Sequence, residues 1–312
     1  MNSTANLTQW WGPVHYLTNG IMGLQGTVIV SSNLPLILTI AYHQILRSRK
    51  ENIIILFIAF ADFCLGFGIL LRAVVKTYSF YSRSALYPVS RHICIFDVNA
   101  QLVIFSSTAQ SYLLAVQSAD RLIAVAWGLP YLAMENRPIW LCCSFLLFFD
   151  FGQCFLFAFL SWGNRQLIWN AQCMPATTLT ESAFHYWNGS STLCATVSVL
   201  LYFVVILLMY KRRGSKVGAK TNKELDMQLK RQRKITLSIG ISCFFTCLFC
   251  VLPRIVIVFL PISQAGFVRL LMAVLYCLNP VLNVFIYMKR HKEFRSGFNL
   301  LFKGQLPLNV IK

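Results

Sequence analysis

The feature that most constrains this chain is a series of apolar runs, each about as long as a bilayer is thick. A membrane-spanning helix needs roughly 20 predominantly apolar residues. Only 12% of the residues are charged, about half the roughly 25% of a typical soluble domain. Seven runs in the 312-residue sequence reach the required length: 21–46, 52–77, 93–126, 138–162, 187–211, 232–260 and 265–288. The sequence therefore predicts an all-α fold, a seven-transmembrane helix bundle.

The basic residues fall in the gaps between the apolar runs, and their distribution predicts the topology. The formal net charge of +18 could indicate a nucleic-acid-binding protein, but such proteins gather their cations on one face of a soluble domain. Here the loops after the first and fifth runs and the C-terminal segment are rich in Lys and Arg, as cytoplasmic loops are. We therefore expect a plasma-membrane protein without a nucleic-acid partner, with an extracellular N-terminus (1–20), a membrane domain (21–288) and a cytoplasmic tail (289–312).

The segment 289–302 follows the last apolar run and has the pattern of a short amphipathic helix. Its apolar residues share one helical face and its basic residues occupy the others, as in helices that lie on a membrane surface. The alternative is a polar tail without regular structure. The apolar face consists of Phe294, Phe298, Leu301 and Phe302.

The predicted outer side carries two kinds of extracellular signal. Asn2 and Asn6 each begin an acceptor sequence for N-glycosylation. Cys94 begins the third run, and Cys173 lies between the fourth and fifth runs. Because both face an oxidising compartment, we expect a disulfide between them; Cys194, within the fifth run, is the weaker candidate.

The third run, from Ile93 to Trp127, carries a polar stripe at helical spacing. An apolar helix with one polar face must turn that face toward protein or water rather than lipid. We therefore expect this segment to be an interior helix that other helices surround. The stripe comprises Asn99, Val103, Ser106, Gln110, Leu114, Gln117 and Arg121.

Several residues, in order and spacing, make the chain similar to the rhodopsin-like G-protein-coupled receptors over nearly its whole length. The matching positions are Asn33, Ala61-Asp62, Asp120-Arg121-Leu122, Trp140, Pro253, Asn279-Pro280 and Lys292-Glu293-Phe294-Arg295. The chain departs from the family at Asn283, where a tyrosine is usual, and at Val251, where the sixth helix usually has an aromatic residue. With these departures and its short N-terminus, the chain resembles the nematode serpentine chemoreceptors of the Srsx class.

The resemblance implies that Arg121 contacts a heterotrimeric G protein and pairs with Asp120 in the resting state. The alternative is a boundary pair that merely extends to the lipid headgroups. Position 233 is Arg, so an acidic partner for Arg121 on the sixth helix is missing. We therefore expect weak restraint and some ligand-independent signalling.

A polar cluster is expected near the middle of the membrane. A carboxylate such as that of Asp62 is costly inside a bilayer unless it is solvated, paired or protonated. The resemblance implies a sodium ion at Asp62, and the alternative is a protonated Asp62 bound to amides. The cluster comprises Asn33, Asp62, Gln110, Asn279 and Asn283.

Four cations lie in the outer halves of the predicted helices, where the family pattern places a central ligand pocket. Val103 occupies the depth at which amine receptors hold an aspartate. We therefore expect a small-molecule ligand with a carboxylate, phosphate or sulfate, clamped by Arg254 and Arg269. The alternatives are that these cations extend to the headgroups or pair with Asp150. The predicted ligand-binding residues are Arg72, Lys76, Asn99, Val103, Arg254 and Arg269.

Other functional classes fit the sequence less well. It contains no Gly-x-Gly-Asp or His-Glu-x-x-His motif of an intramembrane protease, so we expect neither an enzyme nor a cofactor. A transporter often shows internal repeats, and no repeat is evident here. The seventh run has no Lys before Lys289, which excludes a retinal Schiff base in the usual position. A receptor for a neuropeptide or another endogenous transmitter remains the main alternative to a chemosensory receptor.

Overall fold

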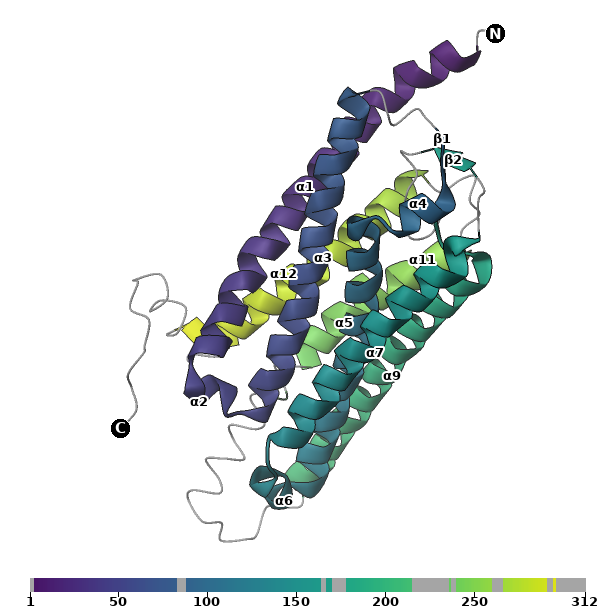
Figure 1. Cartoon of the computed structure of the whole chain (residues 1–312). Helices are drawn as coiled ribbons and strands as arrows, with labels where there is room; N and C mark the ends of the chain where they lie inside the picture. Colours follow the sequence, from purple (N-terminus) through teal and green to yellow (C-terminus); the bar gives the residue numbers. More distant parts are fainter. Residues whose placement is uncertain are drawn as a thin grey trace.

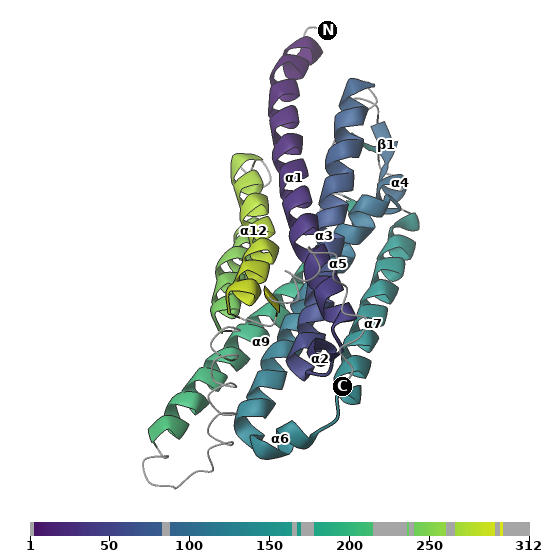
Figure 2. The ribbon, with the colours of Figure 1, turned by 90° about the vertical axis from the view of Figure 1, so that its left-hand side faces the viewer.

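The structure is a computed structural model, and nearly every segment that it describes is helical. It describes residues 3–82, 88–163, 167–169, 178–214, 236, 240–259, 266–290 and 294–295. The long helices are α1 (Ser3–Tyr42), α3 (Lys50–Tyr81), α5 (Val98–Trp127), α7 (Arg137–Trp162), α9 (Glu181–Gly214) and α12 (Gly266–Arg290). Short helices are α2 (Gln44–Arg47), α4 (Arg91–Ile95), α6 (Leu129–Ala133) and α11 (Leu252–Phe259). They run side by side as an elongated bundle (Figures 1 and 2).

Four of the described helices are long and apolar enough to cross a membrane. They are Tyr16–Tyr42, Lys50–Tyr81, Arg137–Trp162 and Glu181–Lys211, and two shorter apolar helices cover Gly240–Val256 and Val274–Lys289. These segments fall within or around the predicted apolar runs. The described residues thus form an all-α, multi-pass membrane protein, and the count of seven spans remains a prediction.

Helix α5 is the interior helix of the bundle, as its polar stripe predicts. It packs against α3, α7 and α9, and the stripe residues Asn99, Ser106, Gln110, Gln117 and Arg121 are all buried. The helix does not begin at Ile93, as the sequence suggested. The short α4 ends at Ile95, and Asp97 has an extended conformation before the first turn of α5.

Helices α1 and α3 approach closely at a pair of glycines. A Cβ atom on Gly26 would lie 2.8 Å from the carbonyl oxygen of Gly66, and a Cβ atom on Gly66 would lie 2.7 Å from the Cγ2 atom of Ile29. Small residues at such crossings let two membrane helices pack backbone against backbone. This contact holds Asp62, one turn away on α3, at a defined place in the bundle.

A π-helical turn, Cys247–Val251, precedes Pro253 on the helix that continues as α11. Proline has no backbone N–H to donate, so helices commonly change their hydrogen bonding or direction near it. Arg254 follows directly. This local change of helical geometry therefore lies next to the deepest cation of the predicted ligand pocket.

A small two-stranded antiparallel sheet covers the end of the bundle where α4 lies (Figure 1). Strands β1 (Pro88–Ser90) and β2 (Leu167–Trp169) are antiparallel, with Val89 opposite Ile168. Cys94, on the adjoining α4, is buried and disulfide-bonded. Its predicted partner, Cys173, lies outside the described residues, so the pairing remains a prediction.

Only part of the predicted surface helix is described. Phe294 is buried among apolar side chains of α1, α3 and α12, including Leu36, Ile55 and Tyr287. The sequence pattern predicts that Phe294 faces the membrane surface. In the structure its side chain instead packs onto the helical bundle. The other apolar residues of the segment, Phe298, Leu301 and Phe302, lie outside the described residues, as does Asn2.

Candidate functional site

The C-terminal end of α5 holds a closed ionic cluster, called here the Arg121 cluster. Arg121 is buried, its Nε atom donates to the Asp120 carboxylate at 3.0 Å, and its Nη2 atom donates to the same oxygen. The Tyr131 hydroxyl donates to the other Asp120 oxygen at 2.7 Å and accepts from Arg121 Nη2 at 3.2 Å. Three polar groups thus satisfy one another, and the guanidinium has a carboxylate as its counter-charge.

Tyr131 is positioned by the loop that follows α5. It lies on α6, at the opposite end of the bundle from the β1–β2 sheet (Figure 1). Lys50, at the start of α3, donates to the Tyr131 carbonyl oxygen at 2.5 Å, and its ammonium lies 4.3 Å from the centre of the Tyr131 ring. Burial raises the pKa of the Tyr131 hydroxyl well above its usual value, so the hydroxyl stays neutral and keeps its proton for Asp120.

Four residues of the predicted polar cluster take part in buried hydrogen bonds between side chains of different helices. Gln110 Nε2 donates to Asp62 Oδ1 at 2.9 Å. Asn279 Oδ1 accepts from the Thr246 hydroxyl at 3.1 Å, and Asn283 Oδ1 accepts from the Ser242 hydroxyl. Asp62 Oδ2 and the side-chain nitrogens of both asparagines are buried without a hydrogen bond of normal geometry among the described residues, but the Asn283 side chain lies close enough to Asp62 to stabilise its charge.

Asn33 does not join this cluster by hydrogen bonds of the described residues. Its side-chain amide donates to the Ile29 carbonyl oxygen of its own helix at 3.0 Å. The residue is buried, so an amide without that bond would be costly. Its hydrogen bond therefore contributes to α1 itself rather than to Asp62.

Arg254 projects inward from α11 and binds three neutral acceptors. Its Nη1 atom donates to the Ser111 hydroxyl at 3.2 Å, and its Nη2 atom donates to the Ser107 carbonyl oxygen at 3.0 Å and to the Tyr276 hydroxyl at 3.1 Å. The guanidinium carbon also lies 5.2 Å from the centre of the Tyr276 ring. Within the described part of the chain, no salt bridge joins this buried cation to a carboxylate.

A chain of hydrogen bonds connects Arg254 with Asp62. Arg254 donates to Tyr276, and the Tyr276 hydroxyl donates to Gln110 Oε1 at 3.2 Å. The opposite end of the same carboxamide donates to Asp62. The predicted pocket and the predicted mid-membrane cluster are therefore one continuous polar network through α5 and α12.

The two cations of α3 form a separate group near its C-terminal end. Arg72 and Lys76 both experience the negative charge of Asp97, which immediately precedes α5. Lys76 is buried, and the Nε atom of Arg72 is buried without a hydrogen-bond partner among the described residues. Of the predicted ligand-binding residues, these two lie together, and Arg254 belongs to the deeper network.

The remaining predicted ligand-binding residues lie elsewhere or are not described. Asn99 is buried, and its backbone oxygen lies close to Gly68 of α3. Val103 packs with apolar residues that include Leu65 and Ile69 of α3. Arg269 belongs to the first turns of α12, but its side chain lies outside the description, as do Arg233 and the side chain of Asn6.

Sequence reasoning missed several residues that complete these networks: Lys50, Ser107, Ser111, Tyr131, Ser242, Thr246 and Tyr276. A signal existed for Tyr276, because it shares a helical face with Pro280 and Asn283. Ser107 and Ser111 are also one turn apart on α5. The sequence held no comparable signal for Tyr131, which lies in a loop without periodicity.

An all-α, multi-pass bundle with a buried Asp-Arg pair at one end of its central helix has the architecture of a receptor that signals across a membrane. The family model of the serpentine type 7TM GPCR chemoreceptor Srsx matches residues 27–302. The chain therefore belongs to that family, a family of receptors. A search of curated proteins gave no match.

Proposed function

We propose that this receptor binds a small anionic molecule in the outer half of its helical bundle and activates a heterotrimeric G protein through Arg121. The observation that carries the ligand class is the environment of Arg254. Its guanidinium is buried, and the three acceptors that it binds among the described residues are neutral. A buried charge without a counter-charge is costly even when hydrogen-bonded, so a ligand that supplies an anion gains the interaction that the protein leaves open.

The second group of cations supports the same ligand class. Arg72 and Lys76 lie together on α3, within the electrostatic influence of the Asp97 carboxylate. An anion that enters from this end meets Arg72 and Lys76 first and Arg254 at greater depth. A bidentate pair between Arg254 and a carboxylate, phosphate or sulfate would give the complex its orientation.

The proposal places the ligand and the G protein at opposite ends of α5. In this topology the chain has seven spans, the N-terminus and the β1–β2 sheet lie outside the cell, and α2 and α6 lie in the cytosol. The basic residues Arg47, Arg49 and Lys50 at the α2–α3 junction support this orientation. A chemosensory role follows from the family, whereas the anionic ligand follows from Arg254.

The test is a response screen in cells that express the receptor with a G-protein reporter. Short carboxylic acids are compared with amides and amines of the same carbon skeleton, in the wild type and in the variants Arg254→Gln, Arg254→Lys and Arg47→Gln. Arg47→Gln is the control, because Arg47 is exposed and lies at the other end of the bundle.

We expect acids to activate the wild type and the amides and amines to fail. Loss of a charge-assisted hydrogen bond costs about 1.5–3 kcal/mol, so Arg254→Gln should weaken the potency of an active acid roughly 10- to 100-fold. Arg254→Lys should retain part of the response, and Arg47→Gln should retain all of it. An unchanged acid potency in Arg254→Gln, at equal surface expression, would reject the anionic pocket.

A further inference from the structure

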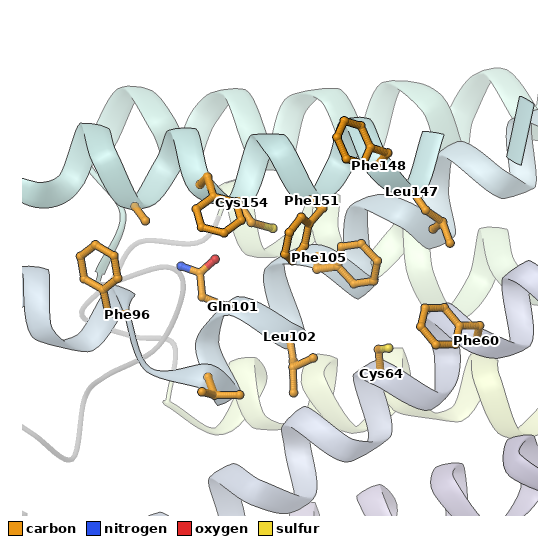
Figure 3. Close-up of a pocket in the computed structure, with 13 residues that line it drawn as sticks. Phe60, Cys64, Phe96, Gln101, Leu102, Phe105, Leu147, Phe148, Phe151 and Cys154 are labelled. Carbon is orange, nitrogen blue, oxygen red and sulfur yellow. The ribbon is translucent and has the colours of Figure 1, made fainter. Parts of the chain in front are cut away.

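A cavity lies on the outside of the bundle, away from the polar network. It has a volume of about 610 Å³ and is formed by α3, α5 and α7. Cavities of this size fall within the range of small-molecule sites. Figure 3 shows its lining residues along the seam between α5 and α7, with Phe96 and Gln101 toward one end and Phe60 and Leu147 toward the other.

The cavity opens toward the surroundings of the bundle rather than toward its centre. Several of its lining side chains, including Phe148, Phe151 and Phe155, are exposed large hydrophobic groups on α7. On a membrane-spanning helix such a surface faces lipid. A ligand therefore reaches this cavity from the bilayer and not from the aqueous pocket at Arg254.

The lining is aromatic and uncharged. It contains no Lys, Arg, His, Asp or Glu among the residues that the structure assigns to it. Charged lipid headgroups and fatty-acid carboxylates therefore find no counter-charge there. Six phenylalanines contribute to the lining: Phe60, Phe96, Phe105, Phe148, Phe151 and Phe155.

One carboxamide gives the cavity a single directional contact. Gln101, in the first turn of α5, projects between α5 and α7 (Figure 3). Its Nε2 atom donates to the Ile95 carbonyl oxygen, which orients the amide and leaves Oε1 as an acceptor. Within the described part of the chain, no hydrogen bond to Oε1 is formed by another residue. A ligand with one hydroxyl group fits this arrangement.

We propose that the cavity binds a sterol alcohol from the bilayer, with its hydroxyl donating to Gln101 Oε1 and its ring system lying against the phenylalanines. The lining residues on α7 extend from Leu147 to Ala158, which corresponds to about 16 Å of helix. A rigid ring system loses less conformational freedom on binding than a flexible acyl chain does. Gln101 lies at the end of α5, where a hydroxyl can remain near the polar boundary of the bilayer.

Two residues of α7 provide a matched pair of variants. Phe155 lines the cavity and is 62% exposed, whereas Phe159, one turn further on, is 76% exposed and does not line it. Replacement of either by alanine removes the same side chain from a lipid-facing surface. Only Phe155→Ala removes a contact from the proposed site.

The experiment uses the full-length receptor in phospholipid nanodiscs prepared without sterol. A photoreactive sterol with a free hydroxyl is added, alone or with unlabelled cholesterol as competitor, and labelled peptides are identified by mass spectrometry. The methyl ether of the same probe and a photoreactive phospholipid serve as comparison probes. The proteins are the wild type, Phe155→Ala, Phe159→Ala and Gln101→Leu.

We expect saturable labelling of α5 and α7 by the sterol and at least about tenfold weaker apparent affinity in Phe155→Ala, from the loss of buried aromatic area. Phe159→Ala should bind as the wild type does. Gln101→Leu should abolish a preference for the free hydroxyl over the methyl ether, which we expect to be about fivefold. Equal effects of the two phenylalanine variants, equal labelling by the methyl ether in the wild type, or stronger labelling by the phospholipid would each overturn the proposal.

Discussion

Arg121 belongs to α5, and Arg254 donates hydrogen bonds to α5. Both arginines are buried, but the protein compensates their charges differently. Arg121 has the Asp120 carboxylate and the Tyr131 hydroxyl as partners. Arg254 has a serine hydroxyl, a backbone carbonyl and a tyrosine hydroxyl. The burial of a guanidinium is costly in both places, yet among the described residues a carboxylate binds the guanidinium directly only at Arg121.

This difference separates a closed site from an open one. In the Arg121 cluster the guanidinium is paired with the Asp120 carboxylate. These charge-assisted hydrogen bonds must break before Arg121 can contact another protein. Among the described residues Arg254 is hydrogen-bonded only to neutral groups, so an anion can be added there without the loss of an existing ion pair. Under the proposed function, an anionic ligand would bind at Arg254, and the ion pair at Arg121 would open when the receptor is activated.

The largest expected effect is on signalling, from replacement of Arg121. Arg121→Gln should reduce ligand-stimulated G-protein activation to the level of empty vector, because the proposed contact loses its charge. Since the single change leaves Asp120 buried without its partner, Asp120→Asn with Arg121→Gln is the companion variant for surface expression. A full response in either variant, measured at matched surface levels, would remove Arg121 from the proposed coupling site.

The next effect is on stability, and it tests the comparison directly. Arg121→Met leaves an unpaired buried carboxylate, which costs about 3–5 kcal/mol, so we expect its Tm to fall by about 10 °C. Arg254→Met leaves only neutral groups without a partner, at about 1–3 kcal/mol, and its Tm should fall by roughly half as much or less. The measurement is thermal unfolding of purified variants in one detergent. Equal losses of Tm would mean that Arg254 has a counter-charge after all.

A smaller effect is expected from removal of the Tyr131 hydroxyl, which bonds both Asp120 and Arg121. Tyr131→Phe removes one hydrogen bond to Asp120 and one from Arg121, so ligand-independent signalling should rise about fivefold, as for a loss of roughly 1 kcal/mol. Tyr112→Phe is the control. Tyr112 lies in another part of α5, and its hydroxyl donates to Gln153 Oε1 of α7 at 3.3 Å. The readout is nucleotide exchange on the G protein in isolated membranes without ligand.

The same measurement has a pH component. Because burial raises the pKa of Tyr131 above its usual value, the hydroxyl stays protonated below the ordinary tyrosine pKa of about 10. The ratio of basal activity between Tyr131→Phe and the wild type should therefore stay constant between about pH 6 and 9. A ratio that falls toward one as the pH rises would show that the hydroxyl loses its proton, and would contradict a neutral Tyr131.

The contrast between these sites also explains how far the sequence could lead. The interior position of α5 follows from the spacing of residues such as Gln110 and Gln117, because amides inside a membrane need protein partners. The Asp120-Arg121 pair is adjacent in the chain, so its proximity was evident. The start of α5 was harder to predict, because the apolar run continues through Ile93 and Ile95 although the helix is interrupted at Asp97.

The partners of Arg254 and the role of Tyr131 could not be derived in the same way. Ser107 and Tyr276 belong to helices whose rotation about their own axes decides which side chains meet, and periodicity leaves that rotation open. Tyr131 reaches Arg121 because a short loop helix folds back against α3. The restraint on Arg121 was expected to be weak because position 233 is basic, but Tyr131 provides a restraint from a different direction.

The smallest effect is expected from the removal of sodium. The measurement tests whether Asp62 binds a sodium ion in addition to its hydrogen-bonded connection with Arg254. The neighbouring oxygens already accept hydrogen bonds: Gln110 Oε1 from Tyr276, and the oxygens of Asn279 and Asn283 from hydroxyl groups. Sodium requires oxygen ligands, whereas the unpartnered side-chain nitrogens of the two asparagines are donors. Replacement of sodium by N-methylglucamine should therefore change the potency of an active acid by no more than about twofold. The control is Asp62→Asn, which cannot hold a sodium ion by charge; a larger shift in the wild type that disappears in this variant would place sodium at Asp62 and make the network next to Arg254 more positive than the described residues indicate.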